Sequence, residues 1–365
     1  MSKNITRKSF LKHAGTALTI ASVGFPSIII PRKKEKIGVA LVGLGSYAGG
    51  QLAPALQETE YCELRGIVTG TPSKIPEWQE RYGIRDQNVY NYENLHEVAN
   101  NDDIDVIYIV TPPGVHARDA IVAAEAGKHV WCEKPMAMDE EECQNIIDAA
   151  SKNGVQLTIG YRMQHEPNTQ TVIKFGREET YGVITGVQTG AGYSGAHRDP
   201  ENWRRNPDLG GGALYDMGVY PINAARFATG MEPIAVKGRQ WSDREEMYSD
   251  VDEHTDFEME FPNGVIATGE TSFGNSTNYL NVECTDGWYR LSPMQSYRGV
   301  QGETSDGREL PPAGINQQAR QMDNDARAIL DGKDPIVPGE DGLADIRIVK
   351  AIMESSQRGG EWIEL

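Results

Sequence analysis

The chain has 365 residues, which is too long for one compact hydrophobic core and indicates two domains. Its formal net charge of -18 argues against nucleic acid or an anionic membrane surface as a partner, because both require basic patches. The cysteines and histidines show no ligand spacing, so we expect no metal site.

The N-terminal residues 1–31 have the layout of an export signal. A basic segment precedes the charge-free apolar stretch 14–30, which is short for a membrane-spanning helix. Thr6–Lys12 is similar to a twin-arginine signal in which Lys8 replaces the second arginine. We expect an exported, periplasmic protein whose mature form does not contact the membrane. An uncleaved anchor or an N-terminal arm is the alternative.

From residue 37 short apolar runs alternate with helical patterns, as in a parallel sheet covered on both faces. This alternation predicts a doubly wound parallel sheet, a Rossmann domain, over residues 37–158. The expected strands are 37–42, 64–68, 105–110 and 130–132, and the expected helices are 48–56, 115–127 and 139–153.

Beyond about residue 160 the pattern changes to strands with one polar face. Two hairpins are expected, and they predict a large open, mainly antiparallel sheet in an α+β domain over 159–365. This domain would bind substrate and form oligomers. The hairpins pair 256–261 with 265–273 and 279–284 with 288–291, and helices are expected at 316–331 and 342–357.

A glycine-rich turn follows the first strand. Gly43-Leu44-Gly45-Ser46-Tyr47-Ala48 opens a helix there, which is the setting of a dinucleotide-binding turn. The glycines let the pyrophosphate approach the main chain, and the helix N-terminus favours its charge. A purely structural turn is the alternative.

The end of the second strand favours NADP over NAD. An NAD site would place an acidic residue here to bind the ribose 2′-hydroxyl, and Val68–Lys74 has none. Hydroxyls at Thr69, Thr71 and Ser73 with the cation of Lys74 suit a 2′-phosphate instead. A solvated loop lysine is the alternative.

Two further strand ends carry polar side chains, and ligands of such sheets bind at the carboxyl ends of strands. Thr111 and Pro112 follow the third expected strand, and His116 either lines the cofactor or has a structural role. Lys134 ends the next strand and precedes a proline, which favours an extended main chain.

An acid and a phenol stand four residues apart in the second half. On a helix, Asp216 and Tyr220 would lie on one face, and Gly210–Gly212 predicts a flexible entry to that helix. Together with Lys134 they are the groups required to move a proton and a hydride on a sugar carbinol.

These segments resemble the Gfo/Idh/MocA oxidoreductases and, within them, the periplasmic glucose–fructose oxidoreductase branch. The resemblance covers nearly all of the chain after residue 36. Its specific parts are Gly43–Gly45, Val110–Pro112, Cys132–Met136, Gly160–Met163, Trp203-Arg204 and Gly210–Tyr220.

The resemblance implies three catalytic roles. Lys134 would bind the reacting oxygen, Asp216 would hold substrate hydroxyls, and Tyr220 would donate and accept the proton. It also places Thr69, Lys74 and Tyr92 around the adenosine phosphate, with Arg162 nearby, and Trp203 with Arg204 at the nicotinamide. The predicted cofactor-binding set is Gly43, Leu44, Gly45, Ser46, Tyr47, Thr69, Gly70, Lys74, Tyr92, Thr111, Pro112, His116, Glu133, Lys134, Arg162, Trp203 and Arg204.

The expected function is NADP-dependent oxidation of the CH–OH group of a sugar. An exported enzyme cannot rely on free NADP, so a retained cofactor would cycle between an aldose and a ketose. The alternatives are an ordinary sugar or dihydrodiol dehydrogenase with exchangeable cofactor, a glycosidase or lyase acting by transient oxidation, and a non-catalytic sugar or nucleotide sensor. Relatives imply a homodimer or homotetramer. Gln164-His165 departs from the His-Tyr of close relatives, which leaves the substrate open.

Overall fold

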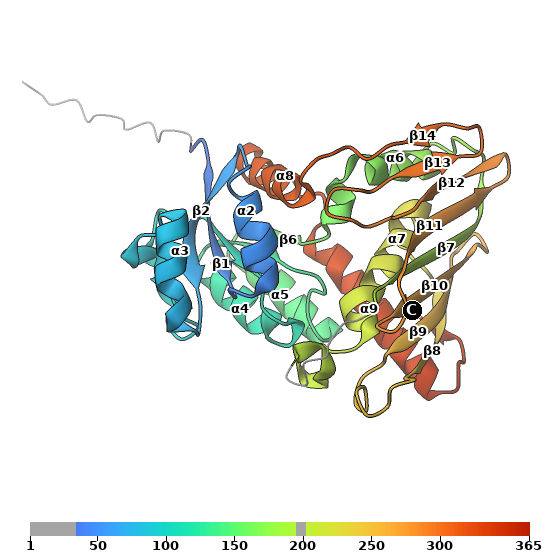
Figure 1. The fold of residues 1–365 in the computed structure, drawn as a ribbon, viewed down its shortest axis with the longest axis horizontal. Helices are drawn as coiled ribbons and strands as arrows, with labels where there is room; N and C mark the ends of the chain where they lie inside the picture. Colours follow the sequence, from blue (N-terminus) through green and yellow to red (C-terminus); the bar gives the residue numbers. More distant parts are fainter. Residues whose placement is uncertain (1–33, 195–201) are drawn as a thin grey trace, which may run out of the picture. The chain divides into compact units, whose positions relative to one another are not determined.

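The computed structural model describes residues 34–194 and 202–365. The expected export signal, residues 1–31, lies outside the described residues. Residues 35–365 form one compact unit that contains two sheets (Figure 1). The predicted domain boundary between residues 158 and 159 stays a prediction.

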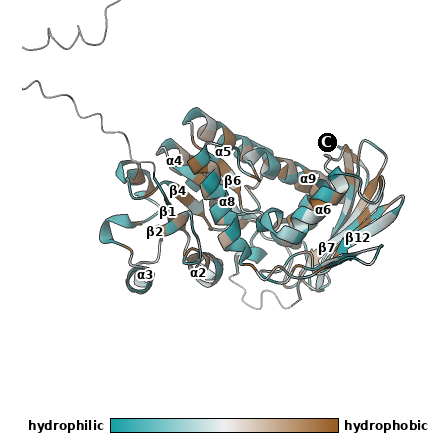
Figure 2. Cartoon of the chain, turned by 90° about the horizontal axis from the view of Figure 1, so that it is seen from above, coloured by the Kyte–Doolittle hydropathy of each residue, from teal (hydrophilic) through white to brown (hydrophobic). Residues whose placement is uncertain are grey.

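The first sheet is the predicted Rossmann sheet. Its six strands are all parallel and lie in the order β3-β2-β1-β4-β5-β6. All six residues of β1 are buried, as the unbroken apolar run predicts (Figure 2). The strands are β1 (Ile37–Val42), β2 (Cys62–Val68), β3 (Val89–Tyr90), β4 (Val106–Ile109), β5 (His129–Cys132) and β6 (Leu157–Ile159).

Helices connect these parallel strands. The first is η1 (Ala48–Leu52), a π-helical turn that continues into α2 (Ala53–Ala55). Asp139 caps the N-terminus of α5, the last of these helices, by accepting a hydrogen bond from the main-chain amide of Glu142. The others are α3 (Ile75–Tyr82), α4 (His116–Glu125) and α5 (Glu140–Lys152).

The second sheet has nine strands in the order β14-β13-β12-β11-β7-β10-β9-β8-β15. Both expected hairpins are present, and within this sheet, as far as the structure describes it, only β7 and β10 pair in parallel. The predicted large, mainly antiparallel sheet is therefore confirmed. Its strands are β7 (Ile184–Gly192), β8 (Ala235–Trp241), β9 (His254–Glu260), β10 (Ile266–Ser272), β11 (Thr277–Cys284), β12 (Gly287–Leu291), β13 (Gly302–Thr304), β14 (Glu309–Leu310) and β15 (Ile363–Glu364).

Helices cover one face of the nine-stranded sheet, where α7 packs on β7 and α9 packs on β8 (Figure 1). Helix α8 instead lies against the first sheet, where its Met322 and Ala326 join the buried cluster around Leu41 and Trp131. The C-terminal half of the chain thus contributes to the core beneath the predicted cofactor site. The helices are α6 (Pro167–Arg177), α7 (Val219–Thr229), α8 (Gln317–Asp331) and α9 (Gly339–Gln357).

Candidate active site

The strand order of the first sheet reverses between β1 and β4, and the glycine-rich turn lies at this point. Gly43 has a φ angle of +91°, which favours glycine. A Cβ atom there would lie 2.9 Å from Cγ2 of Thr111, two residues after the end of β4. The two predicted cofactor segments therefore contact each other.

The residues expected around the adenosine phosphate gather on the β2 side of this turn. The Lys74 ammonium donates a hydrogen bond to the Leu44 carbonyl at 2.7 Å. The Tyr92 ring packs so closely on Gly70 that a Cβ atom at Gly70 would lie 2.9 Å from it. Thr69 is buried, whereas Lys74 is exposed and accessible to a ligand from solvent.

His116 connects two of the predicted cofactor segments. Its Nδ1 lies 2.9 Å from the Pro135 carbonyl oxygen and its Nε2 lies 2.6 Å from that of Thr111. Burial lowers the pKa of His116, against the two carbonyls that favour the charged ring. The side chain is fully enclosed, and its contacts position the turns that carry Thr111 and Lys134.

Lys134 is largely enclosed, with 11% of its side chain exposed. Its ammonium donates a hydrogen bond to the main-chain oxygen of Asp216 at 2.6 Å and lies 4.5 Å from the centroid of the Tyr220 ring. Burial acts to lower the pKa of Lys134, but Tyr220 and the carboxylates of Asp216 and Glu133 raise it above its ordinary value. The amine is therefore held in its charged form against the phenol.

Asp216 and Tyr220 meet Lys134 from consecutive helical segments. Asp216 lies in η9 (Leu214–Gly218), a π-helical turn, and Tyr220 lies in the first turn of α7. Both side chains are buried. The convergence of the three predicted catalytic residues is thus present in the structure, while their roles stay predictions.

Arg204 fixes the carboxylate of Asp216. It lies in η7 (Trp203–Arg205), donates from Nε to Asp216 Oδ2 at 2.6 Å, and stacks on the Trp203 ring at 4.4 Å. Two cations, Arg204 and Lys134, therefore face one carboxylate. A carboxylate has about four acceptor positions, so Asp216 can still accept a hydrogen bond from a sugar hydroxyl.

The glycine run before η9 is a tight turn, which differs from the flexible entry that we expected. Gly212 has a φ angle of +103°, and its amide donates to the Arg204 carbonyl at 2.9 Å. A Cβ atom at Gly211 would lie 2.7 Å from the same oxygen. The glycines allow the main chain to approach Arg204 and so help to place Arg204 beside Asp216.

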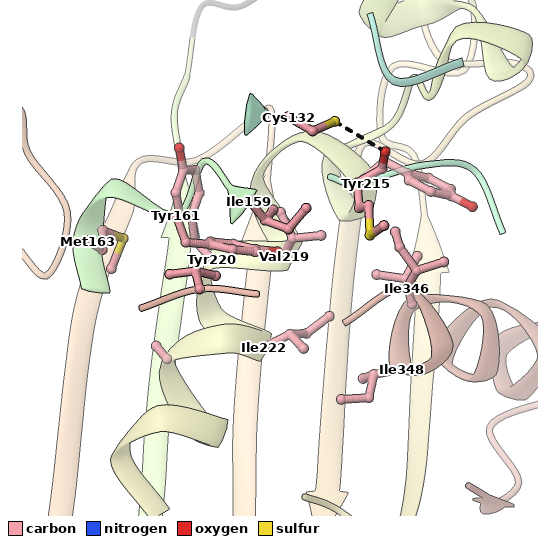
Figure 3. Close-up of a cluster of buried hydrophobic side chains, with 14 of the residues drawn as sticks. Cys132, Ile159, Tyr161, Met163, Tyr215, Val219, Tyr220, Ile222, Ile346 and Ile348 are labelled. Carbon is pink, nitrogen blue, oxygen red and sulfur yellow. Dashed lines mark hydrogen bonds between the residues drawn. The ribbon is translucent and has the colours of Figure 1, made fainter. Parts of the chain in front are cut away.

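Arg162 lies at the catalytic end and not near the adenosine phosphate, where the resemblance placed it. It lies in η6 (Arg162–His165), directly after β6, whereas Thr69 follows β2. Three strands separate β6 from β2 in the sheet, and this explains the difference. The Arg162 guanidinium lies 5.5 Å from the Tyr220 ring centroid, on which Tyr161 also packs edge-on (Figure 3).

Glu133 is a carboxyl group close enough to Lys134 and Arg162 to interact with both of their charges. It is buried and accepts a hydrogen bond from the Tyr108 hydroxyl at 2.7 Å. Burial raises the pKa of Glu133, although the Tyr108 hydroxyl and the charges of Lys134 and Arg162 act to lower it. Its side chain lies against Gly160, where a Cβ atom would be 2.8 Å from Oε1.

The unusual pair Gln164-His165 is bound within the protein interior. The Gln164 amide donates to Asn223 at 2.9 Å and to Asp341 at 3.0 Å. His165 is buried beside Asn324 of α8, and burial lowers its pKa to about 3. These contacts support α7, α8 and α9, so this departure from the relatives says little about the substrate.

Two residues at the catalytic end had no signal in the sequence. Tyr297, between β12 and β13, lies with its ring centroid 4.9 Å from the Arg162 guanidinium and 6.3 Å from the Tyr47 ring. Gln295 accepts a hydrogen bond from Arg162 Nη2 at 3.0 Å. Both belong to an irregular loop with no residue pattern, so only the fold reveals their position.

The residues around the Gly43–Gly45 turn fit a dinucleotide. A Cβ atom at Gly45 would meet nothing within 4 Å, so the turn leaves room for a ligand. Among the residues that the structure describes, the buried Thr111 hydroxyl and Arg162 Nε have no hydrogen-bond partner. Buried polar groups normally have partners, so these two are available to the polar groups of a cofactor.

The described ranges 34–194 and 202–365 contain neither a metal-binding cluster nor a membrane-spanning helix. No group of three or more His, Cys, Asp or Glu side chains in them has the arrangement of a metal site. No helix in them is both long enough and apolar enough to span a membrane.

Comparisons with known proteins agree with this arrangement. The chain matches "Oxidoreductase family, NAD-binding Rossmann fold" over residues 37–161 and "GFO/IDH/MocA C-terminal domain" over residues 169–290. It is 30% identical to D-xylose 1-dehydrogenase [NADP(+)] of Haloarcula marismortui over 87% of this chain and 90% of the relative.

Solved structures are similar over almost the whole chain. The aldose-aldose oxidoreductase of Caulobacter crescentus, complexed with glycerol, is 36% identical with a TM-score of 0.86, over 90% of this chain and 100% of that one. A 3-ketoreductase of Actinomadura kijaniata, in complex with TDP-benzene and NADP, is 25% identical with a TM-score of 0.74, over 88% and 98%. The chain therefore belongs to the Gfo/Idh/MocA family of oxidoreductases.

Proposed function

We propose that the protein is an NADP-dependent oxidoreductase that interconverts a carbinol and a carbonyl group on a sugar. The observation that carries this proposal is the convergence of Lys134, Asp216 and Tyr220 at a dinucleotide-binding sheet. Similarity to a xylose dehydrogenase and an aldose-aldose oxidoreductase supports a sugar as the substrate.

In the proposed reaction Tyr220 takes the proton of the sugar hydroxyl and returns it in the reverse direction. NADP, when bound, supplies the hydride acceptor or donor. A free tyrosine has a pKa of about 10, which is high for a base near neutral pH. The positive charges of Lys134 and Arg162 at the Tyr220 ring stabilise negative charge that develops on its oxygen. Asp216, fixed by Arg204, orients the substrate hydroxyls.

The preference for NADP is supported by the adenosine end of the site. Lys74 is exposed beside the glycine-rich turn, and no acidic residue occupies the end of β2. Ser46, Thr69, Gly70 and Tyr92 would surround the adenosine ribose and phosphates. Two of the relatives named above also carry NADP in their descriptions.

We further propose that the cofactor is retained and alternates between two sugars, an aldose as donor and a ketose or second aldose as acceptor. The predicted export signal supports retention, because free NADP is not expected outside the cytoplasm. The aldose-aldose relative supports two sugar substrates. The xylose dehydrogenase relative favours the second candidate, an ordinary dehydrogenase whose cofactor exchanges.

Nicotinamide fluorescence of protein purified through desalting, with no nucleotide added, separates the two candidates. A retained cofactor that cycles would give fluorescence that rises with glucose and falls with fructose or a second aldose. Protein that carries no nucleotide but oxidises sugar with added NADP would establish the ordinary dehydrogenase. Absence of sugar-dependent reduction with either form would contradict the proposed function.

Localisation and assembly are part of the proposal. Residues 1–31 would direct export, and we expect the protein in the periplasmic fraction only when they are present. We expect a homodimer or homotetramer built on the outer face of the nine-stranded sheet, which carries the half-buried Lys237–Glu258 pair. Light scattering of the mature protein that gives a monomer mass would contradict this.

A further inference from the structure

The strap, residues 292–299, makes up most of the loop 292–301 between β12 and β13 and connects the two halves of the site. We infer that the strap is a retention element that closes the dinucleotide site and slows release of NADP between turnovers. This inference rests on the proposed function, because it assigns a role toward the cofactor of that same site.

The base of the strap is firmly attached to the C-terminal half of the chain. Asn278 of β11 makes two hydrogen bonds with the main chain of Gln295, at 2.7 and 2.9 Å. The Gln317 amide of α8 donates to the Ser296 carbonyl. The strap is therefore held in one place at its base.

The tip of the strap lies across the catalytic end of the site. The Tyr297 ring faces Tyr47 at 6.3 Å with an interplanar angle of 30°, and its other contact is the Arg162 guanidinium at 4.9 Å. Arg162 in turn contacts Tyr220. This row of contacts runs from Tyr47, just beyond the Gly43–Gly45 turn, to Tyr220. A bound dinucleotide must connect the same two regions of the site.

A second contact joins the tip to the N-terminal half. Arg298 pairs with Glu58, just after α2, at 3.4 Å, and both side chains are exposed. An exposed ion pair and an aromatic stack are each weak interactions. The tip can therefore separate from Tyr47 and Glu58 while the partly buried hydrogen bonds at the base remain, which makes the tip the part that controls release.

Tyr297 is partly exposed to solvent, as expected of a side chain that covers a bound ligand. Its side chain is among the exposed large hydrophobic groups, although it contacts two site residues. Arg162 Nε is buried and, within the described part of the chain, has no hydrogen-bond partner. A dinucleotide beside Arg162 would provide that partner and would be covered by Tyr297 on the solvent side.

The test measures cofactor release and does not depend on turnover. The full-length protein is loaded with NADPH, desalted and mixed with excess NADP, and the decay of bound nicotinamide fluorescence gives the release rate. We expect Tyr297→Ala to accelerate release about ten-fold or more and Arg298→Ala about two- to five-fold. Tyr297→Phe, which keeps the ring, should release at close to the wild-type rate.

Arg290→Ala is the matched control. Arg290 pairs with Glu303 across the same hairpin, but this pair joins β12 to β13 and does not reach the N-terminal half. Its release rate should equal that of the wild type. The thermal unfolding midpoint of each variant shows whether the fold is intact, and Arg298→Ala tests the inference if Tyr297→Ala does not fold.

The results distinguish failure of the retention role of the strap from failure of the proposed NADP-dependent function. Wild-type protein that binds NADPH, with folded Tyr297→Ala and Arg298→Ala variants that release it at the wild-type rate, would overturn the retention role of the strap alone. Wild-type protein that does not bind NADPH would overturn the proposed function and this inference with it.

Discussion

The two ends of the cofactor site differ in how firmly their side chains are held. At the catalytic end, Asp216 and Tyr220 are buried, and Asp216 is contacted by both Lys134 and Arg204. At the adenosine end, Lys74 is exposed and makes a single hydrogen bond to a main-chain oxygen among its described contacts.

The difference in how firmly the side chains are held follows from the proposed task of each end, which is proton transfer at one and recognition of the 2′-phosphate at the other. Charges act strongly on a reacting group only where water is excluded, so residues with the predicted catalytic roles should be enclosed and fixed by one another, as Lys134, Asp216 and Arg204 are. Recognition of a 2′-phosphate requires only a cation and hydroxyls at the rim. Substitutions at the catalytic end should therefore slow the reaction, whereas substitutions at the adenosine end should change only the choice of cofactor.

The largest effect is expected for Tyr220→Phe. Loss of the phenol hydroxyl removes the proton acceptor, so turnover should fall by about a hundred- to ten-thousand-fold. NADP affinity, measured by fluorescence titration, should stay within about two-fold of the wild type, because the hydroxyl is assigned to the substrate. Tyr279→Phe, which loses a hydroxyl bonded to Glu270 on the outer sheet face, is the control. Equal turnover of the Tyr220→Phe variant would remove Tyr220 from the proposed role.

The next effect concerns the carboxylate at the catalytic end. Arg204→Gln removes the charge-assisted bond to Asp216, and kcat/KM for the sugar should fall by about ten- to a hundred-fold. The adjacent Arg205 donates to the Met247 carbonyl instead, so Arg205→Gln should leave kcat/KM nearly unchanged. Equal losses in both variants would mean that the segment as a whole, and not the Arg204–Asp216 pair, is required.

A smaller effect is expected at the adenosine end. Lys74→Ala should weaken NADP binding by about ten-fold and leave NAD binding nearly unchanged, because one charge-assisted contact to the 2′-phosphate is lost. Turnover at saturating NADP should not change. Dissociation constants of both nucleotides provide the test, with the exposed Lys152→Ala as the control. A loss of NADP and NAD affinity to the same extent would show that Lys74 does not discriminate between them.

The last effect concerns stability and not activity, in the support beneath the catalytic end. Asp325 of α8 is fully buried, and burial raises its pKa to about 8. Between about pH 4 and pH 8 the folded state keeps this proton while the unfolded state loses it, so stability falls as the pH rises. Each pH unit in this window should cost up to about 1.4 kcal/mol. Asp325→Asn should remove this contribution, and urea unfolding at pH 5 and pH 7 would show it; an unchanged slope would contradict it.

The sequence predicted the catalytic end better than the contacts that support it. The apolar run of β1, the turn at Gly43 and the positions of Lys134, Asp216 and Tyr220 depend on local patterns, and the structure places them as expected. The pairing of Arg204 with Asp216 depends on the approach of two segments in space, which no spacing in the sequence records.

Tertiary context also explains the remaining differences. Arg162 was expected near the adenosine phosphate, and only the strand order places it beside Tyr220. Tyr297 lies in an irregular loop, so its contact with Tyr47 had no signal in the sequence. Local patterns therefore predicted the elements and the convergence of Lys134, Asp216 and Tyr220, whereas the fold determines which residues surround them.

The most direct test of the central proposal is hydride transfer from a labelled sugar in a single turnover. Protein loaded with NADP is mixed with an aldose deuterated at the anomeric carbon, and deuterium in the reduced cofactor is measured by mass spectrometry over time. We predict deuterated NADPH with the wild type and formation slowed by at least about a hundred-fold in Tyr220→Phe. No transfer from any aldose tested, or equal rates in the two proteins, would contradict a sugar oxidoreductase that uses Tyr220 as its acid and base.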